Sequence, residues 1–162
     1  MIENIANWVD KLVSDYLPQA RRCSELHPSI KQYFPRDFLE NSYFIITNDI
    51  PKLDIQFESS NVESFINMDG DGITYKNLYF IKEHRAFDPT IHVHELVHVA
   101  QWKLLGVTGF IEKYINELEN CGYNDAPLEK MAYAIEDRFA LRNELFDITS
   151  VVKDELKKLY GV

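Results

Sequence analysis

The sequence predicts an α+β fold with a small, mostly antiparallel sheet followed by a buried central helix and further C-terminal helices. Apolar residues recur at helical spacing near both ends of the chain, whereas residues 43–82 carry alternating, β-branched and aromatic runs. With 162 residues, 46% of them hydrophobic, the chain can build one sizeable core but not two. We therefore expect one domain over residues 1–162, with an N-terminal helical region at 1–40, the sheet at 41–86 and the C-terminal helices at 87–162.

The first half of the chain changes from helical to strand periodicity. An amphipathic pattern predicts a helix over residues 3–17, and prolines break residues 18–40 into short helical turns. Aspartates and glycines at residues 69–72 predict a tight hairpin turn. A calcium loop is disfavoured there, because Leu78 stands where such a loop has its bidentate glutamate. Strands are expected in four runs, namely residues 43–47, 52–57, 62–68 and 73–82.

The second half of the chain has clear helix ends. Asp88 is the expected N-cap, Pro89 the first-turn residue and Gly106 the stop of a helix over residues 89–105. This segment is apolar on nearly all sides, which predicts a central, buried helix. Three more amphipathic helices are expected: one over residues 107–121, one that begins with Asp125 as cap and Pro127 in its first turn, and one over residues 149–159.

The buried helix carries the sequence His-Glu-Leu-Val-His at residues 94–98. Positions i and i+4 share one face of a helix, so His94 and His98 can direct two imidazole nitrogens toward one metal ion. Zinc is the expected ion, and Glu95 can take a proton from a bound water. The alternative is a pair of core histidines with ordinary hydrogen bonds. Because buried polar groups need partners, and one ion serves both imidazoles, the motif favours a metal-dependent hydrolase.

The remaining histidines do not complete the site. An H-E-x-x-H-x-x-G-x-x-H motif would need glycine and histidine where this chain has Gln101 and Leu104, so a metzincin arrangement is excluded. His92 stands two residues before His94 and points away from the metal face. His27 and His84 lie in predicted loops without a second ligand nearby, so a downstream glutamate is the better third ligand.

Glu129 is the preferred third ligand, and Glu136 is the alternative. Together with Tyr133 they share one side of the helix that begins at Pro127. They are seven positions apart and therefore about 10 Å apart along the helix axis, so only one of them can reach a given ion. Glu129 lies in the first turn, where its other explanation is an interaction with the helix dipole. We expect Glu136 to make an ion pair or a hydrogen bond to a ligand histidine.

Charge and composition restrict the partners. A formal net charge of −9 argues against nucleic acid and against an anionic membrane as partners, so we expect a protein or peptide substrate. The N-terminus does not resemble a signal peptide, and no apolar run reaches the length of about 18 residues that a membrane span needs. Cys23 and Cys121 form no disulfide framework, so a cytoplasmic setting is the default expectation, with non-classical secretion as the alternative. The sequence predicts no particular oligomeric state.

Two stretches of the chain resemble a known family. HELVHVAQW, followed by NDAPLEKMAYAIEDRF, resembles the gluzincin-type zincins, in which a glutamate on a following helix completes the HExxH site. The similarity covers about residues 34–140 and is closest to small bacterial zincin-like domains, including the core domain of extracellular contractile injection systems. It implies a minimal zincin-like fold and zinc-dependent peptide hydrolysis. By this resemblance one zinc ion is bound by His94, His98 and Glu129, with Glu95 as the general base.

The chain also departs from that pattern. Related sequences often carry a second acidic residue near the ligand glutamate, where this chain has Lys130 and Met131. Four positions after Glu129, this chain has Tyr133 in place of aspartate. Tyr123 and Tyr133 are candidates to hydrogen-bond the oxyanion, with packing as the alternative role. A strand within residues 73–82 offers an edge for an extended substrate.

Three other functions fit the same residues. A regulatory peptidase that cleaves a repressor-type partner would use an identical site. A catalytically inactive zinc-binding domain, acting as a docking or structural module, would bind zinc without turnover. A purely structural zinc site is disfavoured because such sites are usually rich in cysteine and have no use for Glu95.

Overall fold

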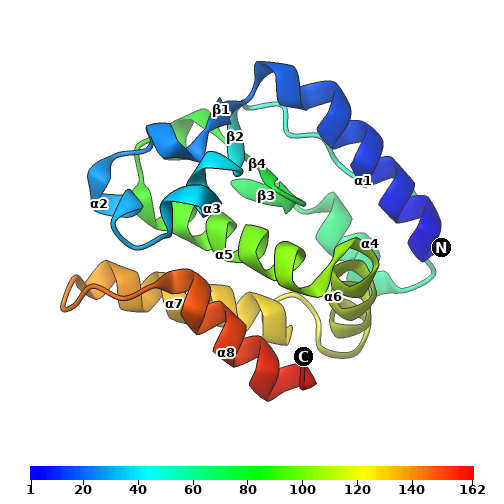
Figure 1. Ribbon diagram of the computed structural model, residues 1–162. Helices are drawn as coiled ribbons and strands as arrows, with labels where there is room; N and C mark the ends of the chain where they lie inside the picture. Colours follow the sequence, from blue (N-terminus) through cyan, green and yellow to red (C-terminus); the bar gives the residue numbers. More distant parts are fainter.

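The computed structural model, which describes residues 1–162, has eight α-helices and a four-stranded sheet, with the buried helix α5 at the centre (Figure 1). This arrangement confirms the α+β class. The helices are α1 (Ile2–Tyr16), α2 (Pro28–Lys31), α3 (Arg36–Glu40), α4 (Ser60–Asn67), α5 (Pro89–Leu105), α6 (Val107–Cys121), α7 (Pro127–Leu141) and α8 (Ile148–Tyr160). Three short 3₁₀ turns, η1 (Leu17–Gln19), η2 (Cys23–Glu25) and η3 (Glu83–Arg85), complete the helical elements.

The sheet is mixed and has the strand order β1-β2-β4-β3. Its strands are β1 (Arg21–Arg22), β2 (Tyr43–Ile46), β3 (Gly72–Tyr75) and β4 (Leu78–Ile81). Two pairings, β1 with β2 and β3 with β4, are antiparallel as expected, but β2 and β4 are parallel. Parallel neighbours need a crossover connection, which here includes α4. Strand β3 lies at the edge of the sheet, and this position matters for the site.

The predicted strand over residues 62–68 is wrong, because this segment belongs to α4. Its apolar residues Val62, Phe65 and Ile66 have the i, i+3, i+4 spacing of a helix face. Ser59 caps the helix by accepting a hydrogen bond from the Val62 N–H at 3.4 Å. The aromatic and β-branched composition favoured a strand, but the spacing of these residues and the cap favour the helix.

The hairpin turn lies further along the chain than predicted. Residues 69–72 lead from α4 into β3, and the turn between β3 and β4 is formed by Lys76 and Asn77. Lys76 adopts the left-handed conformation with φ of 59°, as a two-residue hairpin turn requires. The predicted strand over residues 73–82 is therefore two strands. The strand predicted over 52–57 is also wrong, because these residues are extended but pair with no strand.

The helices of the second half follow the prediction closely. Helix α5 spans Pro89–Leu105, with Asp88 as N-cap and Gly106 at φ of 77° at its C-terminal end. Helix α7 begins at Pro127, but its N-cap is Ala126 and not Asp125. The polar cap of α7 comes from elsewhere, because the Leu128 N–H donates to the Glu117 carboxylate of α6 at 2.8 Å. Residues 18–40 form short helical turns as expected, together with the unpredicted strand β1.

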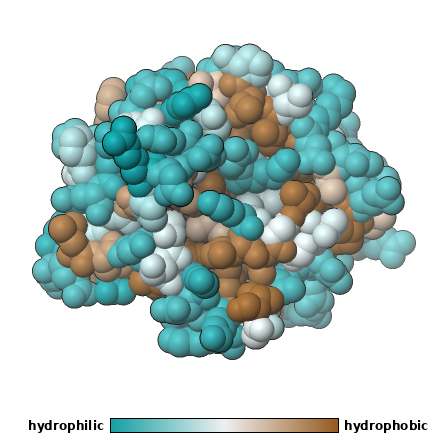
Figure 2. Space-filling model, in the orientation of Figure 1, coloured by the Kyte–Doolittle hydropathy of each residue, from teal (hydrophilic) through white to brown (hydrophobic).

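Helix α5 lies between the sheet and the C-terminal helices α7 and α8 (Figure 1). Twelve consecutive residues, Ile91–Trp102, are buried, which confirms the expectation of a central helix. One cluster of 35 buried apolar residues includes side chains from every α-helix except α4. The face shown in Figure 2 is mostly hydrophilic, with apolar residues in separate patches. None of the helices combines the length and apolar character that a membrane span requires.

The Asp88 cap of α5 is expected to stabilise the fold in a pH-dependent way. Its Oδ1 accepts hydrogen bonds from the N–H and hydroxyl of Thr90, and its Oδ2 pairs with Arg85 at 2.8 Å. Burial opposes ionisation, but these hydrogen bonds and the guanidinium outweigh it and lower the pKa of Asp88 below its ordinary 3.8. Asp88→Ala should lower the free energy of unfolding by about 1–2 kcal/mol at neutral pH.

This effect has a defined pH window. A carboxylate whose pKa is depressed by folding stabilises the protein above its ordinary pKa, and the stabilisation is lost as pH falls through the folded-state pKa. Denaturant unfolding of native protein and Asp88→Ala should therefore show a difference at neutral pH that shrinks in acid. Asp88→Asn, which keeps the cap but loses the ion pair with Arg85, is the matched control. A difference that persists unchanged in acid would contradict this assignment.

Candidate metal centre

Two helices bring three potential ligands together in the interior. His94 and His98 project from one face of α5, and Glu129 projects from the first turn of α7. The His94 Nε2 lies 3.1 Å from Glu129 Oε1, and the His98 Nε2 lies 3.1 Å from Glu129 Oε2. All three side chains are buried, and their ligand atoms lie within 4.8 Å of one another, so the cluster can hold a metal ion.

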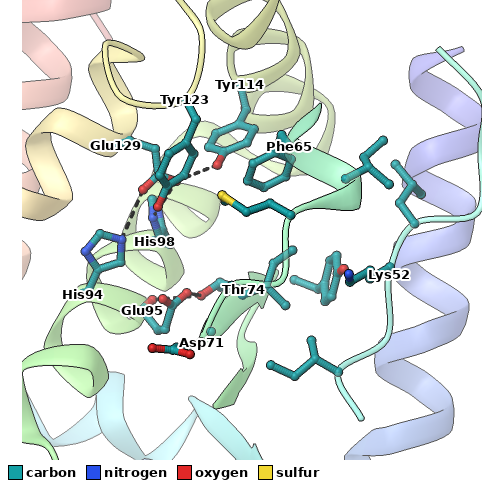
Figure 3. Close-up of a pocket in the computed structure, with 18 of the residues that line it drawn as sticks. Lys52, Phe65, Asp71, Thr74, His94, Glu95, His98, Tyr114, Tyr123 and Glu129 are labelled. Carbon is teal, nitrogen blue, oxygen red and sulfur yellow. Dashed lines mark hydrogen bonds and ion pairs between the residues drawn. The ribbon is translucent and has the colours of Figure 1, made fainter. Parts of the chain in front are cut away.

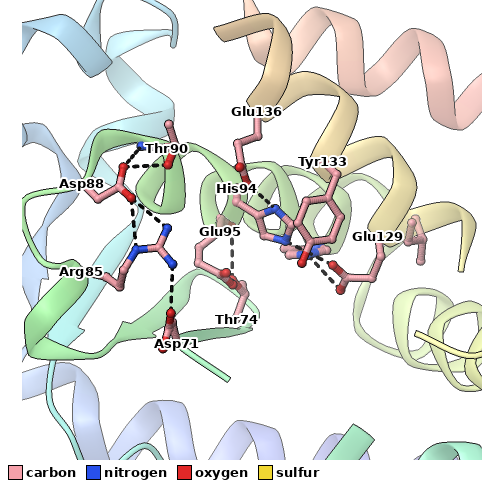
Figure 4. A network of polar contacts seen from close by, with 12 residues as sticks. Asp71, Thr74, Arg85, Asp88, Thr90, His94, Glu95, Glu129, Tyr133 and Glu136 are labelled. Carbon is pink, nitrogen blue, oxygen red and sulfur yellow. Dashed lines mark hydrogen bonds and ion pairs between the residues drawn. The ribbon is translucent and has the colours of Figure 1, made fainter. Parts of the chain in front are cut away.

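The other nitrogen of each imidazole has its own acceptor. The Nδ1–H of His94 donates to Glu136 Oε1 at 3.0 Å (Figure 4). The Nδ1–H of His98 donates to Gln101 Oε1 at 2.7 Å. Both acceptors are oxygens without a proton to give, so each Nδ1 must carry the hydrogen. In the neutral imidazoles both Nε2 lone pairs then face the Glu129 carboxylate. These two lone pairs and the negative carboxylate repel one another, so a metal cation or protons must lie between them.

The pKa values of the cluster reflect this arrangement. Burial opposes the charge on His94, but the Glu129 and Glu136 carboxylates outweigh burial and raise the pKa of this imidazole to about 11. The pKa of His98 is raised for the same reason, by the charge of Glu129 against the effect of burial. Burial acts to raise the pKa of Glu129, yet the two imidazoles lower it well below its ordinary range. The Nε2 side of both imidazoles therefore favours positive charge, which protons or a metal cation can supply.

Side chains from two other positions hold the cluster in place. Tyr114 on α6 donates to Glu129 Oε2 at 2.5 Å. Gln101 is fully buried and bridges two helices, because its Oε1 accepts from His98 while its Nε2 donates to the Leu128 carbonyl at 3.0 Å. The sequence reasoning missed both roles. For Gln101 there was a signal, namely a polar residue three positions after His98 on an otherwise apolar helix; for Tyr114 there was none.

Glu95 lies beside the cluster and is held by β3. It is buried, and its Oε1 accepts a hydrogen bond from the Thr74 hydroxyl at 2.9 Å. Burial raises the pKa of Glu95, although the neighbouring imidazoles oppose this shift. A Cβ at Gly72 would come within 3.0 Å of Glu95 Oε2, so a glycine in β3 makes room for the carboxylate.

A cavity of about 610 Å³ connects these groups (Figure 3). His94, His98, Glu129 and Glu95 all line it, and so do residues of β3, α4 and α6. Both predicted oxyanion candidates also line the cavity.

Tyr123 and Tyr133 contact each other, and Tyr133 also lies against His94 of the cluster. The Tyr123 and Tyr133 hydroxyls lie 2.8 Å apart. The Tyr133 ring lies 4.5 Å from the His94 ring, measured between centroids. Tyrosine hydroxyls are therefore available next to the candidate metal ligands.

The other histidines lie outside the cluster, as expected. His92 points toward the sheet, where its Nδ1 accepts from the Tyr79 hydroxyl and its Nε2–H donates to the Ala86 carbonyl, both at 2.8 Å. His27 caps α2 by accepting from the Ser29 N–H. His84 is exposed in η3. Each of these side chains has a local structural explanation and none competes for the candidate ion.

The fold and the cluster define an α+β protein with a buried His-His-Glu donor set. Comparison of the chain with known protein families, curated proteins and solved structures found no match. The resemblance to zincins therefore rests on the motif residues alone, and the function has to be argued from the geometry of the site.

The hydrogen bond from His98 to Gln101 gives a direct test of how the cluster is held. Gln101→Met keeps a similar volume but removes the acceptor for His98 Nδ1–H, so it should weaken zinc binding by about 10–100-fold. Gln101→Glu keeps an oxygen toward His98 and should bind zinc more tightly than Gln101→Met. Competition with a chromophoric chelator measures both affinities. Equal affinities in the two variants would contradict an orienting role for Gln101.

Proposed function

We propose that this protein is a zinc-dependent peptidase in which His94, His98 and Glu129 hold the metal and Glu95 is the general base. One observation carries the proposal. Two imidazole Nε2 atoms converge on a buried carboxylate, while each Nδ1–H is taken by another acceptor, and a further carboxylate stands beside them in the same cavity. A closed structural site would not need that further carboxylate.

The donor set suits zinc. Two neutral imidazoles and one carboxylate are a usual ligand set of catalytic zinc and leave a position for substrate or solvent. Hydrogen bonds from the ligand histidines to carboxylate or amide oxygens fix the ring orientation, as Glu136 and Gln101 do here. When bound, zinc supplies Lewis-acid polarisation of the carbonyl under attack. The two cysteines take no part, because Cys23 is buried against Tyr79 and Cys121 is exposed on α6.

Glu95 is suited to the proton transfers of peptide hydrolysis. Thr74 donates to its Oε1, and its Oε2 accepts no hydrogen bond from the protein. We assign Glu95 to take a proton from the attacking water, whose oxygen bonds to the carbonyl carbon, and to pass that proton to the amine that leaves when the C–N bond breaks. A pKa raised by burial brings the carboxylate closer to the working pH of a general base.

Two further features suit a peptide substrate. The Tyr123 and Tyr133 hydroxyls can donate to the carbonyl oxygen as it gains negative charge. Strand β3 is the edge of the sheet and lines the same cavity, so an extended peptide can pair with it. Together they place a hydrogen-bonding edge, a base and hydroxyl donors around one metal position.

The proposal is tested with metal analysis and a peptide pool. Purified protein should contain one zinc per chain, and it should cleave peptides of a proteome-derived pool, with new termini identified by mass spectrometry. A strong chelator should abolish cleavage, and zinc should restore it. Full zinc occupancy in His98→Ala would remove the assigned site. Bound zinc without any cleavage would instead indicate the inactive docking module.

A further inference from the structure

Glu117 is a buried acid on α6 that the proposed reaction does not use. It is 7% exposed, and each of its carboxylate oxygens accepts a hydrogen bond. Oε1 accepts from the Leu128 N–H of α7 at 2.8 Å, and Oε2 accepts from the hydroxyl of Tyr160, the last residue of α8. Burial, and then the bond to Glu117, raise the pKa of Tyr160 well above its ordinary 10, so this hydroxyl keeps its proton and donates. One side chain therefore joins three helices.

The bond to Leu128 takes the place of a helix cap. Helix α7 has Ala126 at its N-cap position, which offers no side-chain oxygen, and Pro127 has no N–H. The Leu128 N–H is therefore the first donor at the start of the helix. Leu128 is fully buried, and an unpaired donor in the interior is costly. Glu117 supplies the missing acceptor from a different helix.

The backbone of Leu128 is held on both sides. Its N–H donates to Glu117, and its carbonyl accepts from Gln101 Nε2 at 3.0 Å. The Oε1 of the same Gln101 accepts from the Nδ1–H of His98 at 2.7 Å. An unbroken series of hydrogen bonds therefore connects the end of α8 with a candidate metal ligand.

Helix α6 also contacts the candidate ligand on α7. Tyr114 lies three positions before Glu117, on the same face of α6, and donates to Glu129 Oε2 (Figure 3). Glu129 directly follows Leu128 in the chain. Helix α6 thus holds the first turn of α7 at two points, one on the carboxylate and one on the backbone beside it. A displacement of this turn would move both oxygens of Glu129 away from the imidazoles, which now lie 3.1 Å from them.

We infer that Glu117 is a positioning residue of the metal centre, through which helix α8 fixes Glu129 against His94 and His98. The inference rests on the proposed function, because it takes these three side chains as the metal ligands. Figure 1 shows the last turn of α8 near the start of α7, and Glu117 contacts both. Glu117 acts on the backbone beside the ligand and not on the metal itself.

Zinc affinity, measured by competition with a chromophoric chelator, tests this role. Glu117→Leu removes both acceptors, so zinc should bind about tenfold more weakly, the lower end of the loss for groups that orient a ligand directly. Glu117→Gln should restore native affinity, because its amide can accept from Leu128 and donate to the Tyr160 hydroxyl. Tyr160→Phe should weaken zinc binding less than Glu117→Leu does. Added to Glu117→Leu, it should cause no further loss, because both changes remove the same contact.

A matched control separates positioning from a general loss of stability. Val13→Ala removes buried apolar volume on α1, which lies on the other side of α5 from α7 (Figure 1). It should lower the melting temperature without a change in zinc affinity. Cobalt(II) in place of zinc reports the coordination geometry through its visible absorption. The spectrum should change in Glu117→Leu and stay native in Glu117→Gln and Val13→Ala. Thermal melting of the metal-free proteins checks that each variant is folded.

The outcomes separate this inference from the proposed function. Native zinc affinity and a native cobalt spectrum in Glu117→Leu would overturn the positioning role and leave the zinc site standing, and so would an equal loss of affinity in Val13→Ala. If Glu117→Leu does not fold, Tyr160→Phe decides by the same criteria. Weaker zinc binding in the variants, with no cleavage by the native protein, would support the positioning role and reject the peptidase. A native protein that binds no zinc would overturn both.

Discussion

Replacing Glu95 with glutamine should lower peptide turnover by about 10²–10⁴-fold, the usual contribution of a general base, while one zinc per chain is retained. Glutamine has the same shape and can still accept the hydrogen bond from Thr74, but it cannot take a proton from water. Zinc should stay because Glu95 is not one of the three clustered side chains proposed to bind it. Turnover of the peptide pool and elemental analysis of the same preparation measure the two quantities.

Two outcomes would contradict this role of Glu95. Equal turnover in native protein and Glu95→Gln would exclude it as the base. Loss of zinc in Glu95→Gln would make it a ligand and require a different base. The matched control is Glu112→Gln, the same chemical change on an exposed position of α6, which should alter neither zinc content nor turnover.

The parts of the fold that were predicted correctly depend on local signals. Helix α5 has its cap, its first-turn proline and its terminal glycine within the segment, so its bounds can be read without knowledge of the rest of the chain. Helix α4 is harder to predict, because its aromatic and β-branched residues are typical of a strand and its eight residues give few repeats of helical spacing. Pairing between β2 and β4 joins segments more than thirty residues apart, and periodicity carries no information about that partner.

The residues of the candidate site also divide into those that local spacing predicts and those that depend on tertiary packing. His94 and His98 are four positions apart on one helix, so their spacing alone predicts a shared face. Glu129 and the secondary role of Glu136 were suggested from the face of a second helix, and the structure places both next to the histidines. The supporting residues could not be found in this way. Thr74 and Tyr114 act only because β3 and α6 pack beside α5 and α7, which is a tertiary property.

The contacts of the two glutamates on α7 suggest different roles in zinc binding. Glu129 places one oxygen near each Nε2 atom of His94 and His98. Glu136 contacts only His94, at the Nδ1 side that faces away from the cluster. The first geometry is that of a ligand and the second that of a group which orients a ligand.

Glu129→Gln should therefore lower zinc affinity by more than about 100-fold, beyond the 10–100-fold loss that follows removal of an orienting group. Glu136→Gln keeps an oxygen toward His94 Nδ1–H, so its loss should fall at or below the lower end of that range. The two variants make the same chemical change on one helix, and each controls for the other. Chelator competition gives the affinities, and thermal melting of the metal-free proteins checks that both are folded. A larger loss in Glu136→Gln would transfer the ligand role to Glu136 and place the ion on the opposite side of the His94 ring.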